Sequence, residues 1–141
     1  MTAPVRLVVT AAVIARGDTF LVTRRPRGAH LAGFWEFPGG KCEAGEPLDA
    51  CLRREIREEL DCAAIVHDEI YSVIHAYDER IVELHFFWCT LEGAPRPALG
   101  QEMQWVGRGD LRSLSFPPAD AELIALLEQG LAATPRSPQA P

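Results

Sequence analysis

The sequence predicts an α/β fold in which a mixed β-sheet lies between helices. Stretches of apolar and β-branched residues recur between turn residues, as they do in β-strands. Two other stretches, one beginning near Glu46 and one at 119–129, carry apolar residues at helical spacing. The strands and helices do not follow a strict βαβ alternation, and this favours a mixed sheet with helices on both faces.

The N-terminal part predicts a β-hairpin followed by a loop. Residues 5–15 are apolar and β-branched, a turn follows at 16–18, and 19–24 form the returning strand. The proline and glycines of residues 26–34 indicate a loop. A short stretch at 35–37 then leads into Pro38-Gly39-Gly40, a sharp bend where the backbone can approach a ligand closely.

The first helix is expected to begin near Glu46, with Pro47 in its first turn, where a missing amide is tolerated. Its apolar stripe has a spacing of four and consists of Leu48, Leu52, Ile56 and Leu60.

The second half predicts strands at 64–76 and 80–91, joined by a turn at 78–79, and a short strand at 103–106. The second helix, at 119–129, is expected to bury Leu123, Ile124 and Leu127.

The chain of 141 residues suits a single domain, expected over 1–130, with a disordered Pro-rich tail at 131–141. No apolar run is long enough to cross a bilayer, and the N-terminus lacks the pattern of a signal peptide. We therefore expect a cytoplasmic protein that does not bind membranes. Its oligomeric state, monomer or homodimer, stays open.

The net charge of −6 argues against stable nucleic-acid binding, which requires a basic surface. It allows a free nucleotide, provided that a cation accompanies it. The four cysteines form no C-x-x-C pair and have no closely spaced histidine, so we expect reduced, partly buried thiols.

Three glutamates lie on one side of the first predicted helix. At about 100° per residue, Glu55, Glu58 and Glu59 fall within roughly a third of its circumference. On the helix alone they fit a solvated face with ion pairs, because Arg54 stands four residues before Glu58. The preceding glycine loop favours another interpretation, in which magnesium bridges carboxylates and a diphosphate. The Gly39 carbonyl would be a further ligand.

These residues follow the pattern G-x5-E-x7-R-E-U-x-E-E-x-G-U, where U is bulky and aliphatic, and thus resemble the Nudix hydrolases. The matching residues are Gly40, Glu46, Arg54, Glu55, Ile56, Glu58 and Glu59. The resemblance implies an α/β/α sandwich and hydrolysis of nucleoside diphosphates linked to another group. It also implies that Mg²⁺, or Mn²⁺ in its place, binds Gly39 and the three glutamates, one of which acts as general base.

The resemblance assigns structural roles to Gly40, Glu46 and Arg54, with the arginine holding the helix through a glutamate. The pattern's closing glycine and aliphatic residue are replaced by Asp61 and Cys62. A helix end favours a left-handed residue, and aspartate tolerates that conformation.

Further motifs at 23–25, 29–30, 35–41 and 116–120 resemble the MutT branch, and the similarity spans residues 5–128. MutT-type proteins hydrolyse nucleoside triphosphates to a monophosphate and pyrophosphate, and their best-known role in DNA repair is to remove 8-oxo-dGTP. The resemblance implies that phosphate meets Arg25. Other substrate contacts would come from His30, Glu36, Phe37, Pro38, Gly39, Tyr77 and Asp120.

Two positions depart from the MutT pattern. MutT enzymes that prefer 8-oxo-guanine usually carry asparagine where this chain has Asp120, and an ionised aspartate only accepts hydrogen bonds. It favours a base with amino or imino hydrogens, such as cytosine, although guanine also qualifies. MutT relatives carry an additional metal-binding glutamate at a position where this chain has Leu99, and Glu102 is close enough in the sequence to replace it.

Two alternatives remain open at this point. One is a Nudix hydrolase for another substrate, such as a dinucleoside polyphosphate, ADP-ribose or the 5′ end of RNA. The other is a non-catalytic Nudix-like module that senses a nucleotide.

Overall fold

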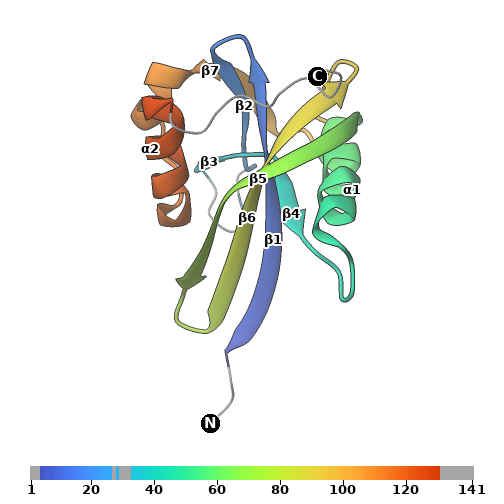
Figure 1. The fold of residues 1–141 in the computed structure, drawn as a ribbon, viewed down its shortest axis with the longest axis vertical. Coiled ribbons are helices and arrows are strands. Elements are labelled where there is room, and N and C mark those ends of the chain that lie inside the picture. The colour runs from blue at the N-terminus through green and yellow to red at the C-terminus, as the bar shows by residue number, and fades with distance from the viewer. Residues whose placement is uncertain (1–3, 27, 29–32, 131–141) are drawn as a thin grey trace.

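The computed structural model describes residues 4–26, 28 and 33–130. In these residues seven strands form one sheet, and helices pack against it (Figure 1). The expected tail and part of the loop at 26–34 lie outside the described residues. The elements are β1 (Val5–Arg16), β2 (Thr19–Arg24), β3 (Trp35–Glu36), β4 (Gly39–Lys41), α1 (Leu48–Leu60), β5 (Ala63–Ala76), β6 (Arg80–Glu92), β7 (Glu102–Gly107), the 3₁₀ helices η1 (Arg108–Ser113) and η2 (Pro118–Asp120), and α2 (Ala121–Gln129).

Strand β1 organises the sheet. The main strand order is β3-β2-β1-β6-β5, with β4 added to β1 and β7 added to β2. β1 runs parallel to β6, from the pair Val5 and Arg80 to the pair Ile14 and Cys89. The other pairings are antiparallel, so the predicted mixed sheet is confirmed.

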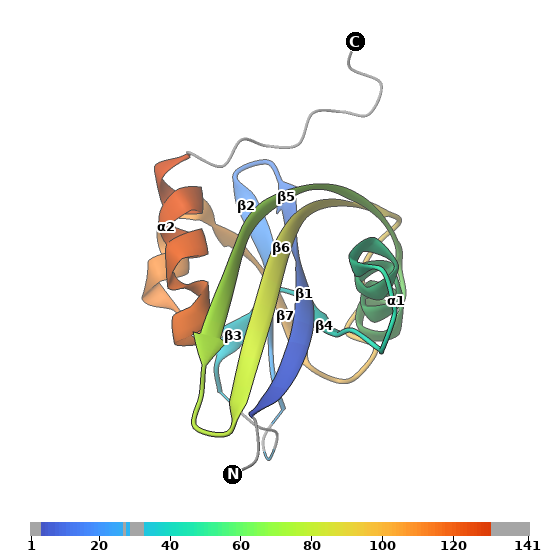
Figure 2. The same ribbon diagram turned by 60° about the horizontal axis from the view of Figure 1, so that its bottom comes forward.

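The sheet separates two hydrophobic cores. Because side chains of a strand alternate between its faces, Ala11 and Val13 of β1 enter one core while Ala12 and Ile14 enter the other. The first core includes Leu123 and Leu127 of α2, and the second includes buried residues of α1. Figure 2 shows the two helices on opposite sides of the sheet, as the predicted sandwich requires.

Helix α1 begins at Leu48, two residues later than expected. Pro47 has an extended backbone and forms the N-cap, and its carbonyl accepts a hydrogen bond from the amide of Cys51. The helix ends at Leu60, and the left-handed conformation of the C-cap residue Asp61 agrees with the tolerance predicted for aspartate there. The Asp61 carboxylate accepts a 2.7 Å hydrogen bond from Arg96, which holds this helix end.

Local structure departs from prediction mainly around short elements. The expected bend at Gly39 and Gly40 includes strand β4, which pairs with Ala11 and Thr10 of β1. Neither 3₁₀ helix was predicted, and η2 precedes α2, which therefore starts at Ala121.

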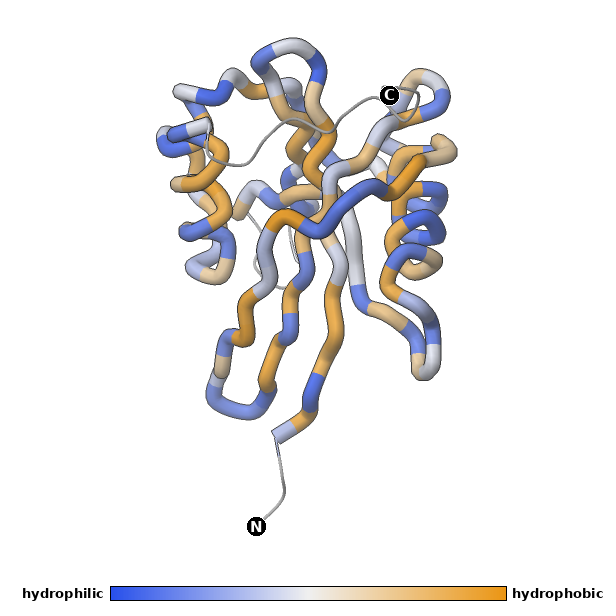
Figure 3. Tube along the Cα trace, viewed as in Figure 1, coloured by the Kyte–Doolittle hydropathy of each residue, from blue (hydrophilic) through white to orange (hydrophobic). Residues whose placement is uncertain are grey.

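The hydropathy pattern accounts for the layers. Hydrophobic residues gather along the strands and helices, whereas the β1–β2 and β5–β6 turns are hydrophilic (Figure 3). Within the described part of the chain, no helix has the length and hydrophobicity needed to cross a membrane.

Candidate active site

Helix α1 presents its three glutamates at different depths. Cys51, Leu52, Ile56 and Leu60 bury one side of the helix against the sheet. Glu55 and Glu59 lie at the edge of that buried side and are half-buried, while Glu58 is exposed. The helical spacing therefore places two carboxylates against neighbouring backbone and the third toward solvent.

The neighbouring backbone belongs to β4. The amide of Gly39 donates a 3.2 Å hydrogen bond to Glu59 Oε2. A Cβ atom at Gly40 would overlap the carboxylate of Glu55, and one at Gly39 would overlap the backbone oxygen of Thr10. The absence of side chains at Gly39 and Gly40 lets the chain pass this closely between β1 and α1, so the glycine loop and the glutamate helix form one unit.

Arg54 connects this unit to the loop in front of α1. Its guanidinium donates to both carboxylate oxygens of Glu46, at 2.8 and 2.9 Å, and to the carbonyl of Lys41 at 3.1 Å. The same side chain donates to Glu55 at 3.0 Å and lies 3.4 Å from both oxygens of Glu58. Arg54 thus fixes the loop and orients two of the three glutamates.

The glutamates generate a negative potential that a cation can relieve. Burial, together with the nearby Glu36 and Glu55 carboxylates, raises the pKa of Glu59 to about 8. Burial also raises the pKa of Glu55, opposed by its hydrogen bond from Arg54. Oxygen-rich, crowded and partly desolvated carboxylates are a suitable ligand set for a hard divalent cation such as Mg²⁺.

A cavity of about 750 Å³ opens beside Gly39 and Gly40. Its apolar wall comes from parallel strands β1 and β6, and includes Val9, Leu84 and Phe86. Phe37 lies against Phe86 with its ring at 87° to it, and against Phe116 in a stacked arrangement. A partly apolar cavity of this size, with the aromatic side chains of Phe37 and Phe86 in its wall, suits a nucleoside.

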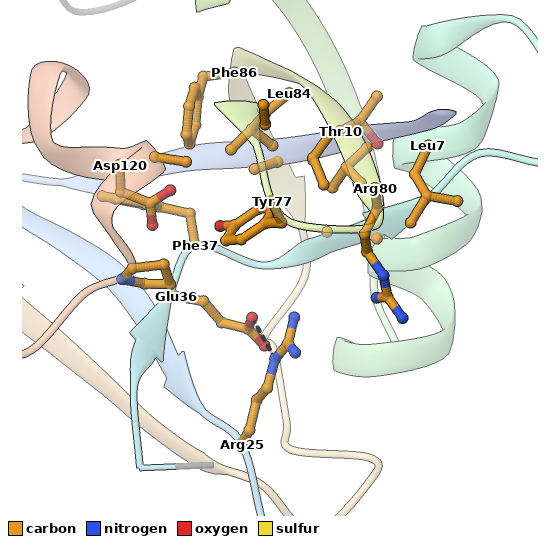
Figure 4. A pocket seen from close by; sticks show the side chains of 18 of the residues that line it. Leu7, Thr10, Arg25, Glu36, Phe37, Tyr77, Arg80, Leu84, Phe86 and Asp120 are labelled. Atoms are coloured by element: carbon orange, nitrogen blue, oxygen red, sulfur yellow. Dashed lines mark hydrogen bonds and ion pairs between the residues drawn. The ribbon is translucent and has the colours of Figure 1, made fainter. Parts of the chain in front are cut away.

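Arg25, Glu36 and Asp120 are polar residues of the cavity, and Arg80 lies apart from them (Figure 4). Arg25 donates a 2.7 Å hydrogen bond to Glu36. The pKa of Glu36 is nevertheless raised, because the effect of burial is larger than the opposing effect of Arg25. Asp120 is only 5% exposed, and η2 places it at the start of α2. Burial and the charge of Glu36 raise its pKa to about 7.

Most of the predicted substrate residues meet in this cavity. Arg25, Glu36, Phe37, Gly39, Tyr77 and Asp120 all line it. Pro38 lies in the sequence between Phe37 and Gly39, which line the cavity. Its carbonyl accepts a 2.7 Å hydrogen bond from the amide of Ala12. His30 lies outside the described residues.

The glutamates predicted to bind the metal lie next to the cavity and not within its wall, whereas the predicted ligand Gly39 lines it. Gly39 and Gly40 line the cavity and contact Glu59 and Glu55 on their other side. Glu102, expected as an extra ligand, is on β7, where its carboxylate accepts a 3.0 Å hydrogen bond from Arg24 Nε. Its assignment to the metal stays a prediction.

Sequence reasoning missed the β1 and β6 wall and the rim at Asp78, Glu79 and Arg80. Because side chains alternate along a strand, the sequence indicates which residues of β1 share a face and which residues of β6 do so. It does not indicate that the two strands pair in parallel, and this pairing combines their faces into one wall. The β5–β6 turn was predicted, and its position at the cavity follows from the same pairing.

Comparisons with known proteins agree with this arrangement. A family model described as NUDIX domain matches residues 9–126. The 8-oxo-dGTP diphosphatase of Haemophilus influenzae is 36% identical over 124 residues, which cover 84% of this chain and 90% of that protein. The CTP pyrophosphohydrolase of Escherichia coli is 33% identical over 117 residues, covering 82% and 87% respectively. The solution structure of the E. coli ORF135 protein matches with a TM-score of 0.81 and 31% identity, covering 95% of this chain and 96% of that one.

Proposed function

Since the chain belongs to the Nudix domain family, we propose that it hydrolyses (deoxy)nucleoside triphosphates to a monophosphate and pyrophosphate. Its substrates would be oxidised or modified nucleotides, and its role the cleaning of the cytoplasmic nucleotide pool. The relatives named 8-oxo-dGTP diphosphatase and CTP pyrophosphohydrolase support this choice. The observation that carries the proposal is the contact between Gly39 and Glu59, because it joins a nucleoside-sized cavity to a cluster of carboxylates.

The site would require Mg²⁺, with Mn²⁺ as the second choice, held by Glu55, Glu58, Glu59 and the Gly39 carbonyl. Bound there, the ion would polarise a phosphoryl group and lower the pKa of a water molecule. One of the three glutamates would accept the proton of that water. Arg54 would keep Glu55 and Glu58 in place through the hydrogen bonds described above.

Asp120 supports a contact with the base. Its carboxylate lines the cavity at the end away from α1, with Tyr77 and Phe37 nearby (Figure 4). Ionised, it only accepts hydrogen bonds and favours amino or imino hydrogens, as on cytosine or on the guanine N1 edge. Protonated, it also donates. With a pKa of about 7, both forms are populated near neutral pH.

A substrate panel with product analysis tests the reaction. We expect each accepted triphosphate to yield pyrophosphate and a monophosphate in the presence of Mg²⁺. Release of orthophosphate, or no turnover of any nucleotide, would reject the proposal.

The base contact has its own test. The kcat/KM values for 8-oxo-dGTP, dGTP, dCTP and 5-methyl-dCTP should change in rank when Asp120→Asn replaces the carboxylate with an amide that both donates and accepts. An unchanged ranking would show that Asp120 does not touch the base, while leaving the reaction type intact.

A further inference from the structure

A separate group of potential metal ligands lies at the start of α1. The Sγ atoms of Cys42 and Cys51 and one carboxylate oxygen of Glu46 lie within 4.8 Å of one another. Cys42 follows β4, Glu46 lies in the connection, and Cys51 is in the first turn of α1. Folding therefore brings together two thiols that are nine residues apart, although neither belongs to a C-x-x-C motif.

This donor set differs from that of the glutamate cluster. Two sulfur atoms and one carboxylate suit a borderline or soft cation such as Zn²⁺, whereas Mg²⁺ takes oxygen ligands. Around a tetrahedral zinc ion, sulfur ligands at about 2.3 Å and oxygen at about 2.0 Å are roughly 3.5 to 4 Å from one another. The corresponding atoms of the ion-free cluster are at most 4.8 Å apart, so small side-chain movements would suffice.

Burial gives the cluster a fixed inner side and an open outer side. Cys51 is fully buried, while Cys42 and Glu46 are half-buried and accessible to a cation from solvent. The Thr10 hydroxyl lies 3.3 Å from Cys51 Sγ, where it can donate to a thiolate and orient it. Three protein ligands leave a fourth position for water on the side that faces solvent.

Glu46 retains capacity for a cation despite its partners. Its carboxylate accepts two hydrogen bonds from Arg54 and one from the amide of Glu43. A carboxylate offers about four lone-pair positions, and the remaining interaction is with the Cys51 thiol, which belongs to the same cluster. The same hydrogen bonds lower the pKa of Glu46 to about 2, which keeps it ionised.

The Cys42 thiol is protonated when no cation is bound. Burial, followed by the contacts with Cys51 and Glu46, raises the pKa of Cys42 to about 12. A bound divalent cation would offset the accumulated negative charge of the deprotonated sulfurs, and each coordinating thiol would release its proton to solvent.

We propose that Cys42, Cys51 and Glu46 bind a thiophilic divalent cation of the zinc class, at a site distinct from the glutamate cluster. The proposal does not depend on the hydrolytic function. Glu46 would bind both the cation and Arg54, so occupation of this site would also affect the hydrogen bonds between Glu46 and Arg54.

Titration of the reduced, full-length protein with Co²⁺ in excess Mg²⁺ tests the site. We expect a near-ultraviolet thiolate-to-cobalt charge-transfer band that Zn²⁺ abolishes by displacing the cobalt. The band should be lost in Cys42→Ser and in Cys51→Ser, and the Co²⁺ affinity should fall at least tenfold in Glu46→Gln. Glu58→Gln, which alters the glutamate cluster, and Cys89→Ser, which removes a buried thiol outside the proposed site, should retain it.

The absence of a band in the wild type, or its persistence in Cys42→Ser, would overturn the proposal. A second measurement avoids the risk that a variant misfolds. In the wild-type protein, Zn²⁺ should slow alkylation of Cys42 by iodoacetamide at least tenfold, as followed by peptide mass spectrometry. Equal rates with and without Zn²⁺ would also overturn it.

Discussion

The glutamates of α1 have different surroundings. Substitutions of these glutamates are therefore expected to differ in their effects on activity and on stability. Glu59 accepts a hydrogen bond from Gly39 and is half-buried, whereas the side chain of Glu58 is 55% exposed. Loss of the Glu58 charge should therefore alter chemistry with little effect on folding.

We predict that Glu58→Gln lowers kcat at least a hundredfold, on the order expected when a metal-binding or proton-accepting carboxylate is removed. The melting temperature should stay within a few degrees of the wild type, because an exposed substitution changes stability by about 0.5 kcal/mol or less. Glu122→Gln on α2 is the matched exposed control and should leave kcat unchanged. A wild-type rate in Glu58→Gln would remove this carboxylate from the reaction.

Asp120 makes folding stability depend on pH. Since folding raises its pKa from 3.8 to about 7, the folded state binds the proton more tightly than the unfolded state. Its contribution to the free energy of unfolding is therefore largest at low pH and falls as pH rises from about 4 to 7.

We predict that Asp120→Asn, which cannot ionise, raises the melting temperature relative to the wild type more at pH 8 than at pH 5. Thermal denaturation of both proteins at the two pH values measures this difference. A difference in melting temperature that is equal at both pH values would mean that the Asp120 carboxyl is not destabilised by burial.

At the scale of elements, the contact between β4 and α1 requires two glycines for different reasons. A Cβ at Gly39 would overlap the backbone of β1, which cannot move without disturbing the sheet. The atoms nearest to a Cβ at Gly40 would belong to the carboxylate end of Glu55, a flexible group.

We predict that Gly40→Ala retains the fold but lowers kcat/KM at least tenfold, because it displaces the Glu55 carboxylate. Gly39→Ala should instead reduce stability, with a loss of more than about 2 kcal/mol in the free energy of unfolding, as expected for overpacking and strain. Urea denaturation and steady-state kinetics of the two variants separate these effects. Gly45→Ala tests the general cost of replacing a positive-φ glycine, since a Cβ there meets no neighbouring atom. If Gly40→Ala has normal kinetics, the position of Glu55 does not limit the reaction.

At the scale of the whole molecule, folding creates the cation site. Gly39 and the glutamates of α1 belong to segments about twenty residues apart and come together only in the folded chain. A cation that binds this arrangement and not the unfolded chain stabilises the protein in proportion to its occupancy.

We therefore predict that Mg²⁺ raises the melting temperature, and more strongly at pH 9 than at pH 6. The pKa of Glu59 is about 8 without the ion, so protons compete with Mg²⁺ below that pH. Thermal scans with and without Mg²⁺ at both pH values measure the effect, and Glu59→Gln should reduce both the shift and its pH dependence. A wild-type melting temperature unaffected by Mg²⁺ would contradict the proposed site.

The chain alone predicted much of the local structure. The spacing of Leu52, Ile56 and Leu60 indicated the buried face of α1, and the same periodicity placed the glutamates at its edge. The hairpins and the helix at 121–129 likewise follow from patterns within a few residues of one another. Strand β4 escaped prediction because its pairing with β1 depends on residues thirty positions away.

Local periodicity by itself determined which residues turn inward and which chemistry α1 offers, because both depend on backbone geometry over one or two turns. Tertiary structure decided which groups meet. Only the parallel alignment of β1 with β6 forms the apolar wall of the cavity, and only the packing of β4 on α1 brings Cys42 to Cys51. Contacts of this kind depend on long-range pairing that optimises burial across the whole chain, and no short segment contains that information.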